Sequence, residues 1–181
     1  MKVALRALIA LSLIFGVTFS YAEDTTPSLT ETKFVDVLAD KFLKKELHCL
    51  AQNIYYEAGS ESFEGKVAVA QVSINRAESG KFPETLCGVV NQKTQISPQK
   101  IVCQFSWVCE GKRLKTAIGD RWEEALTVAR MVLFEGYRLP KLENALYFHA
   151  VHVNPNWGKP KVAKIGNHVF YKDPQPKQQS F

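Results

Sequence analysis

The chain has 181 residues, a formal net charge of +5, 46% hydrophobic residues and 23% charged residues. This composition is typical of a folded protein, so it excludes a wholly disordered chain and a collagen-like repeat, and the length fits one domain. The Lys and Arg residues are scattered rather than clustered, so the charge does not indicate a nucleic-acid ligand, although it suits an anionic polymer.

Residues 1–22 have the pattern of a secretory signal peptide. Two basic residues are followed by an acid-free apolar run from Ala7 to Phe19, and Ser20-Tyr21-Ala22 supplies a cleavage site. The run is shorter than the ~20 residues that a bilayer span needs. We therefore expect cleavage after Ala22 and export to the periplasm or the extracellular space, with no membrane attachment of the mature chain.

Export changes the interpretation of the four cysteines, because an exported chain enters an oxidising compartment. Their even number predicts two disulfides. We favour Cys103–Cys109, which closes a short loop, and Cys49–Cys87, which would join the first core helix to a later turn. A zinc site is the weaker alternative, since the spacing lacks the paired C-x-x-C of structural zinc sites.

The first half of the mature chain is predicted to be mainly helical. Residues 23–32 are polar and are expected to form a loose arm. Apolar residues at helical spacing predict one helix over 33–47 and a second over 48–58, with Gly59 as its stop. Segment 64–77 is apolar on all sides, which indicates burial, and it is the best candidate for the central helix of the domain.

The second half combines short elements with one more helix. We expect a short helical stretch over 82–90, loop or short-strand material over 91–111, a helix over 120–134, and strands over 145–150, 162–165 and 168–171. Gly166-Asn167 is the two-residue turn of the last hairpin. The predicted fold class is α+β, mainly helical, with a small β region late in the chain.

Glu57 is the candidate catalytic acid. It stands in the last turn of a predicted helix beside Tyr55 and Tyr56. The negative end of the helix dipole and partial burial both raise the pKa of a carboxyl group, as a general acid near neutral pH requires. For a lone Glu, an ordinary solvated helix residue is the simpler interpretation. Glu61 and Glu64 are better explained as surface or helix-start acids.

A second candidate stretch is the segment from Cys103 to Cys109, which a disulfide would close into a rigid loop. It would hold Gln104, Ser106 and Trp107 in place. Amide hydrogen bonds and stacking on an indole face are suited to sugar recognition, so the loop is consistent with a carbohydrate cleft. The alternative is that the aromatic residues of this loop belong to the core.

A third stretch, on the strand predicted over 145–150, places Tyr147 and His149 on the same face. One of them can therefore line a cleft if the other does. A metal site built from His149, His152 and His168, with Glu57 as ligand or base, is an alternative. H-x-x-H is a weak signal without the helical H-E-x-x-H arrangement, so no metal is expected. A serine hydrolase is disfavoured because G-x-S-x-G is absent.

Taken in order, these stretches resemble the spore-cortex-lytic type of cell wall hydrolase over roughly residues 47–171. The ordered set is more specific than any one of its motifs. The matching segments are CLAQNIYYEA (49–58), GKVAVAQV (65–72), NR (75–76), FP (82–83), CGVV (87–90), QFSW (104–107) and IGNHVFY (165–171).

The resemblance implies a lysozyme-like single domain that cleaves the glycan strand of peptidoglycan, with Glu57 in the position of the catalytic acid. Many members carry Ala-Arg-Gly-Glu after this Glu, whereas this chain has Ala58-Gly59-Ser60-Glu61. The missing Arg puts the local charge pairing in doubt but not the acid. The expected organisation is a signal peptide (1–22), an N-terminal arm and helix (23–46), the cell wall hydrolase domain (47–172) and a flexible tail (173–181).

The sequence therefore predicts a peptidoglycan-cleaving enzyme, best described as a lytic transglycosylase that cuts the bond between N-acetylmuramic acid (MurNAc) and N-acetylglucosamine (GlcNAc) to a 1,6-anhydro product. No second acid lies in a matching motif, which favours this outcome over hydrolysis. The expected sugar-binding residues are Gln104, Ser106, Trp107, Tyr147 and His149. We expect a monomer that needs no cofactor. A metal-dependent amidase and a non-catalytic wall-binding protein are the two alternatives.

Overall fold

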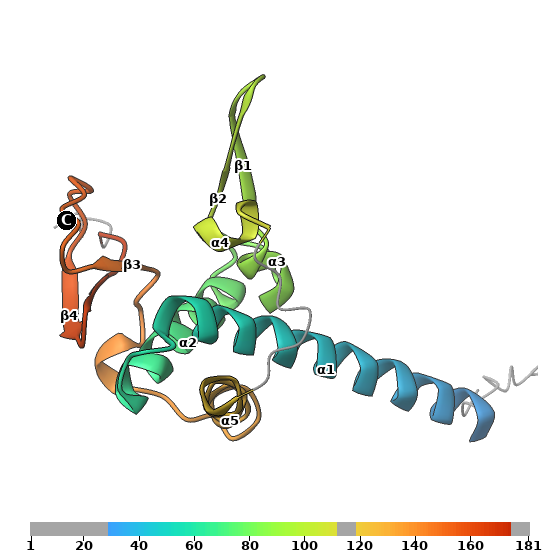
Figure 1. The fold of residues 1–181 in the computed structure, drawn as a ribbon. Coiled ribbons are helices and arrows are strands. Elements are labelled where there is room, and N and C mark those ends of the chain that lie inside the picture. The colour runs from blue at the N-terminus through green and yellow to red at the C-terminus, as the bar shows by residue number, and fades with distance from the viewer. Residues whose placement is uncertain (1–28, 112–118, 175–181) are drawn as a thin grey trace, which may run out of the picture.

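The computed structural model describes residues 29–111 and 119–174. The expected signal peptide and most of the expected tail therefore lie outside the described residues. Three helices form the body of the protein (Figure 1). They are α1 (Leu29–Ala58), α2 (Phe63–Glu78) and α5 (Asp120–Phe134). The mainly helical α+β class predicted from the sequence is confirmed.

Helix α2 is the most deeply buried element, as its all-round apolarity predicted. The hydroxyl of Ser62 caps its first turn by accepting a hydrogen bond from the Gly65 backbone N–H at 3.3 Å. Every residue from Gly65 to Ile74 is buried. One face packs against apolar side chains of α1 and α5, and another against the segments that carry β4 and β5.

Helix α1 corrects the expectation of two helices and of an arm reaching to residue 32. It is one continuous helix from Leu29, because no Gly or Pro interrupts the sequence between its ends. Its first half extends away from the body (Figure 1), and Val37, Leu38 and Phe42 are exposed there. In the described part of the chain, no helix combines the length and the apolarity that crossing a membrane requires.

Between α2 and α5 lies a set of short elements that the sequence located only approximately. They are α3 (Leu86–Val90), β1 (Lys93–Ser97), β2 (Lys100–Cys103) and α4 (Ser106–Cys109). Strands β1 and β2 form an antiparallel hairpin that stands away from the helices, with α4 near its base (Figure 1).

Helix α3 begins at Leu86 rather than at Phe82, where the sequence placed the start of a helical stretch. The Thr85 hydroxyl caps it by accepting from the Gly88 N–H at 3.0 Å. The buried carboxylate of Glu46, on α1, accepts a hydrogen bond from the Leu86 N–H at 2.5 Å. These two acceptors satisfy the first backbone donors of the helix and so determine where it starts.

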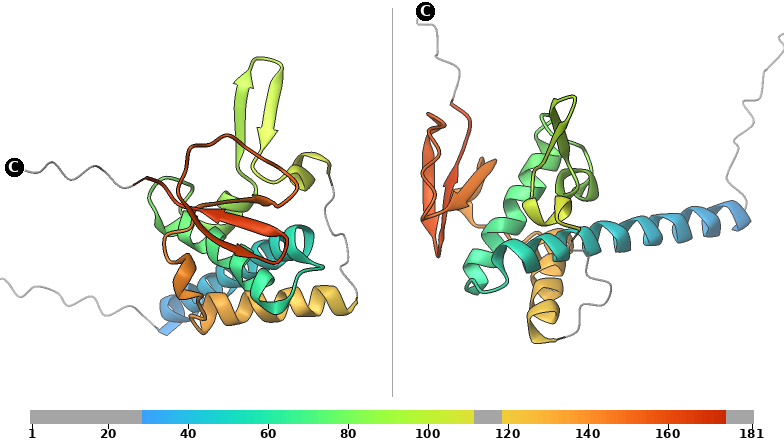
Figure 2. Two further views of the ribbon diagram at one scale, coloured as in Figure 1. Left: turned by 90° about the vertical axis from the view of Figure 1, so that its left-hand side faces the viewer. Right: turned by 45° about the horizontal axis from the view of Figure 1, so that its top comes forward.

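A three-stranded antiparallel sheet completes the fold beside α2 (Figure 2). Its strands lie in the order β3 (Tyr147–Ala150), β5 (His168–Tyr171) and β4 (Lys161–Ile165). The predicted hairpin is confirmed: Ile165 pairs with His168, and Gly166 has a φ of +52°, which a glycine adopts without strain. A short 3₁₀ turn, η1 (Pro140–Leu142), precedes the sheet.

Polar side chains of α2 hold the segment that leads into the sheet. Gln71 exchanges two hydrogen bonds with the backbone of Leu139, at 2.7 and 3.1 Å. The Asn75 amide donates to the carbonyls of Leu142 and Ala145 at 2.8 and 2.9 Å. Because these backbone groups bond to α2, strand β3 begins at Tyr147 rather than at Ala145.

Both expected disulfides are present in the favoured pairing. Cys49–Cys87 joins α1 to α3, and Cys103–Cys109 closes the loop that contains α4. The two bridges differ in the length of chain they close, with sequence separations of 38 and 6 residues. The longer bridge therefore restricts the unfolded chain more.

We predict that replacing Cys49 and Cys87 together by Ala lowers the free energy of unfolding by about 4 kcal/mol, against about 2 kcal/mol for Cys103 and Cys109 together, as loop-closure entropy requires. Urea unfolding of the two double variants measures both values. Non-reducing peptide mapping of the unmodified protein is the control for pairing. Equal losses, or a larger loss for the short loop, would contradict the prediction.

Candidate active site

The carboxyl group of Glu57 lies at the end of α1, half-buried where that helix meets α2 and α4. The last turn of α1 carries no basic residue to offset the negative end of the helix dipole. Burial raises the pKa of Glu57 from 4.5 to about 7, while Trp107 and the charge of Arg76 oppose the rise. Near neutral pH, this carboxyl group therefore exchanges a proton readily.

Trp107 is buried, with 6% of its surface exposed, so it offers no open indole face to a sugar. Its ring stacks on Tyr56 with the centroids 4.5 Å apart. Within the described residues its indole nitrogen has no hydrogen bond of normal geometry, yet the group lies close enough to lower the pKa of Glu57. Its position indicates that Trp107 acts on the carboxyl through its N–H edge.

Arg76, on α2, brings a positive charge to the same place. It is 2% exposed, and its Nε donates to the Leu146 carbonyl at 2.7 Å. Its guanidinium lies between two aromatic rings, 5.2 Å from the centroid of Phe82 and 5.6 Å from that of Phe105. Burial lowers the pKa of Arg76 to about 10, and the nearby Tyr147 and Glu57 oppose this. Arg76 stays charged at neutral pH.

One guanidinium nitrogen of Arg76, Nη1, is buried without a hydrogen-bond partner among the described residues. Among the same residues, Trp107 Nε1 also lacks a partner of normal hydrogen-bond geometry, although it acts on the Glu57 carboxyl. The Trp107 side chain and the charge of Arg76 both lower the pKa of Glu57. Buried donors without partners are rare in folded proteins and are expected to bind something. Here they can bind the carboxylate itself or a polar atom of a ligand beside it.

Tyr147, at the start of β3, approaches Arg76 from the three-stranded sheet. Its ring lies 6.1 Å from that of Phe82, and the Nζ of Lys159 lies 3.9 Å from its centroid. Tyr147 also interacts electrostatically with Arg76. The structure therefore brings Glu57, Trp107 and Tyr147 together around Arg76, although they lie far apart in the sequence.

Gln104 and Ser106 are exposed, on the loop that the Cys103–Cys109 disulfide closes. The backbone N–H of Gln104 donates to the Gln92 carbonyl at 2.9 Å, which ties the loop to the end of α3. Phe105, between them, is buried against the same core as Trp107. Both aromatic residues of the loop are therefore core residues, and its polar residues face solvent.

The three histidines of the possible metal site lie in different surroundings. The ring nitrogens of His149 lie 2.9 Å from the Tyr171 hydroxyl and 2.9 Å from the Ala150 carbonyl, so both already have partners. His152 is exposed, whereas His168 is buried, and burial lowers its pKa. Over residues 29–111 and 119–174, no group of three or more His, Cys, Asp or Glu side chains is placed to hold a metal ion.

Glu61 corrects the expectation of a surface acid, since only 9% of it is exposed. Its carboxylate accepts hydrogen bonds from the backbone N–H and the side-chain amide of Asn167, at 3.2 and 3.0 Å. It thereby joins the α1–α2 turn to the β4–β5 turn. Asp173, expected in a flexible tail, is likewise held, by ion pairs at 2.7 Å to Lys81 and Lys159.

Arg76 is the site residue that the sequence reasoning missed. Its signal was present: a single guanidinium on a helix that is otherwise buried must meet rings, carbonyls or a counter-charge. Phe82 was noted as a motif residue but received no role. Its function as a support for the guanidinium depends on the contact with α2, which no local pattern reveals.

The chain is similar in sequence to known cell wall proteins. A family described as Cell Wall Hydrolase matches residues 60–171. The chain is 30% identical over 136 residues to a spore cortex-lytic enzyme of Bacillus subtilis (strain 168), covering 71% of this chain and 38% of that protein. The spore cortex-lytic enzyme of Oceanobacillus iheyensis is 29% identical over 141 residues, covering 72% and 43%. The chain spans less than half the length of these relatives.

Two solved structures are similar to this one. The catalytic domain of the Bacillus cereus SleB protein aligns with a TM-score of 0.53 and 28% identity, over 71% of this chain and 91% of that one. The catalytic domain of a germination-specific lytic transglycosylase, SleB from Bacillus anthracis, aligns with a TM-score of 0.52 and 28% identity, over 70% and 93%. The lysozyme-like fold class predicted from the sequence is confirmed.

We predict that Glu57→Gln stabilises the protein at pH 8 but not at pH 4. Below pH 4.5 the carboxyl is protonated in both the folded and the unfolded state. Between pH 4.5 and about 7 only the folded state keeps the proton, so the contribution of Glu57 to stability falls as pH rises, by about 3 kcal/mol in total. Gln does not titrate, and the variant should therefore exceed the wild type by up to that amount at pH 8.

Urea unfolding of both proteins at pH 4 and pH 8 measures this difference. Glu64→Gln is the matched control, because Glu64 is an exposed acid paired with Lys141. A gap between Glu57→Gln and wild type that does not grow with pH would show that Glu57 is not held in a desolvated site.

Proposed function

The chain belongs to the cell wall hydrolase family, and from this premise we propose that it cleaves the glycan strand of peptidoglycan with Glu57 as its catalytic acid. The observation that carries the proposal is a half-buried carboxyl whose pKa burial raises to about 7, and on which the Trp107 side chain and the charge of Arg76 act. The family match begins at residue 60, so the role of Glu57 rests on its own motif and on these surroundings.

In the first step Glu57 acts as a general acid. Its proton passes to the glycosidic oxygen between MurNAc and GlcNAc. The bond between that oxygen and C1 of MurNAc then breaks, and its electron pair leaves with the oxygen. A pKa near 7 keeps a large share of the carboxyls protonated at neutral pH while leaving them acidic enough to donate. The nearby charge of Arg76 stabilises the carboxylate that remains.

In the second step the same carboxylate acts as a base. It takes the proton from the C6 hydroxyl of MurNAc, and the C6 oxygen bonds to C1 to close a 1,6-anhydro ring. The proton count balances, and Glu57 returns to its starting state. This chemistry needs no second carboxylate, unlike glycoside hydrolysis with its pair of acids. Glu61 does not compete for the role, because its carboxylate is engaged by Asn167.

The remaining site residues would position the sugars. Arg76 and Trp107 are buried and act on the Glu57 carboxyl, so they would orient that group toward the sugars. Gln104 and Ser106 are exposed on a disulfide-closed loop, where hydrogen bonds to sugar hydroxyls cost little conformational entropy. Tyr147, at the start of β3, supplies an aromatic ring and interacts electrostatically with Arg76. His149 would support Tyr171 rather than contact the reacting sugar.

The cellular setting belongs to the same proposal. We infer export to the periplasm or the cell exterior, where the peptidoglycan is and where the two disulfides are stable. The enzyme would act as a monomer after signal cleavage. It would need no cofactor, because Glu57 carries out each proton transfer described above.

We predict that Glu57→Gln lowers the rate of peptidoglycan digestion by about 10²–10⁴-fold, since the amide keeps the shape of the side chain but cannot deliver a proton. Turbidity of a suspension of purified peptidoglycan measures the rate. Glu64→Gln, which removes an exposed acid, should digest at the wild-type rate. Comparable activity in the Glu57→Gln variant would rule out the mechanism.

We further predict products with 1,6-anhydro-MurNAc ends, each one water lighter than the product of a hydrolase. The C6 hydroxyl is tethered to the reacting sugar, and its effective concentration reaches ~10⁵ M or more when well oriented. Mass spectrometry of soluble fragments decides between the outcomes. Mainly reducing MurNAc ends would require a second carboxylate or an activated water. Free stem peptides from intact glycan, lost on chelation, would identify a metal amidase instead.

A further inference from the structure

The segment between β3 and β4 carries an aromatic side chain that the proposed chemistry does not use. Trp157 is 44% exposed, the most open of the three tryptophans. Val151 and Val153, on the same segment, are 41% and 45% exposed. An exposed indole flanked by further apolar surface next to a candidate active site is a common feature of binding surfaces.

Trp157 is held rigidly by rings of the sheet. His149 and Tyr171 stack on each other, with centroids 5.2 Å apart and an interplanar angle of 27°. The indole stands nearly perpendicular to both, 5.5 Å from His149 and 5.8 Å from Tyr171. Contacts of this kind restrict the two side-chain torsions of Trp157 while leaving much of its surface in solvent. The indole is therefore preorganised for a ligand.

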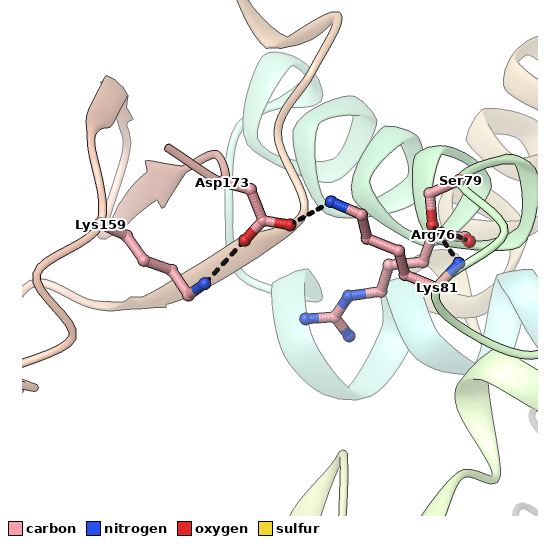
Figure 3. A network of polar contacts seen from close by, with 5 residues as sticks. All are labelled: Arg76, Ser79, Lys81, Lys159 and Asp173. Carbon is pink, nitrogen blue, oxygen red and sulfur yellow. Dashed lines mark hydrogen bonds and ion pairs between the residues drawn. The ribbon is translucent and has the colours of Figure 1, made fainter. Parts of the chain in front are cut away.

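The segment itself is anchored by an ion-pair network (Figure 3). The carboxylate of Asp173 bonds to Lys159 on one oxygen and to Lys81 on the other, each at 2.7 Å. Lys159 follows Trp157 by two residues, and Lys81 lies just after α2. Asp173 thus ties the Trp157 segment to the same part of the chain that carries Arg76. The pKa of Asp173 is held well below its usual range by these two lysines.

Tyr147 connects Trp157 with the candidate active site. Its ring lies 6.2 Å from Trp157 on one side and 6.1 Å from Phe82 on the other. Phe82 in turn supports the guanidinium of Arg76, whose charge acts on Glu57. Ring contacts therefore run from Trp157 through Tyr147 to Phe82, and the charged Arg76 on Phe82 connects this row to Glu57.

We propose that Trp157 is a sugar-stacking residue that binds the glycan strand beyond the sugar pair at Glu57, on the side of the three-stranded sheet. This inference rests on the proposed function. One face of a pyranose ring presents C–H groups that pack on an indole, and its hydroxyl and acetamido groups remain at the rim, where solvent or polar side chains can bond to them. A glycan fits better than a protein partner, because the exposed surface is centred on one ring that the sheet holds in place, and Tyr147 joins it to the candidate active site.

The test measures binding separately from cleavage. In the Glu57→Gln background, the full chain is mixed with purified peptidoglycan, and with a soluble GlcNAc oligosaccharide as a second probe. Adding Trp157→Ala should weaken binding of both probes on the order of tenfold, since truncating an aromatic side chain that a ligand covers has effects of this size. Trp157→Tyr should keep most of the binding. Phe134→Ala, at an exposed aromatic residue on α5, is the matched control and should bind as the parent does.

A second measurement uses the protein with Glu57 intact. Trp157→Ala should raise KM for peptidoglycan on the order of tenfold while kcat changes little, and circular dichroism should show an unchanged fold. Binding equal to that of the parent protein, or a fall in kcat alone, would overturn the inference. If wild type binds but does not cleave, and Trp157→Ala still weakens binding on the order of tenfold, the proposed function fails and the sugar-stacking role stands.

Discussion

Helix α2 is buried along most of its length, so each polar side chain it carries must find a partner inside the protein. Gln71 and Asn75 bond to the backbone between Leu139 and Ala145, and Arg76 bonds to the carbonyl of Leu146. These bonds fix the path of the chain into β3. The position of the sheet, and of every aromatic residue on it, therefore depends on satisfying polar groups of one buried helix.

Arg76 links this structural requirement to the chemistry. The same guanidinium that holds the Leu146 carbonyl lies between Phe82 and Phe105 and acts on the pKa of Glu57. Burial raises the pKa of the carboxyl, and the charge limits the rise, so that a value near 7 results. A desolvated acid of this kind weakens the folded state at neutral pH. The disulfides and the buried helix packing offset that loss.

The secondary structure was largely predictable, because it depends on residues close together in the sequence. Helix α5 begins at Asp120 and ends at Phe134 as expected, and Gly166-Asn167 forms the predicted hairpin turn. The error at α1 shows the limit of this reasoning. Apolar residues at helical spacing indicated helical structure correctly, but the segment is one helix instead of the two expected. Val37 and Phe42 are exposed, which periodicity could not predict, since it does not reveal whether another element covers a face.

For the site, the sequence alone determined the candidate acid, Glu57, the cysteines and their favoured pairing, and the polar loop with Gln104. Only the tertiary structure decided that Trp107 is buried rather than open to sugar, that Glu61 is an internal acceptor, and that Arg76 acts on Glu57. The physical reason is the distance along the sequence between the residues that interact. Helix ends, turns and short loops follow from neighbouring residues, whereas burial, pKa and ring contacts arise between segments that meet only when the chain has folded.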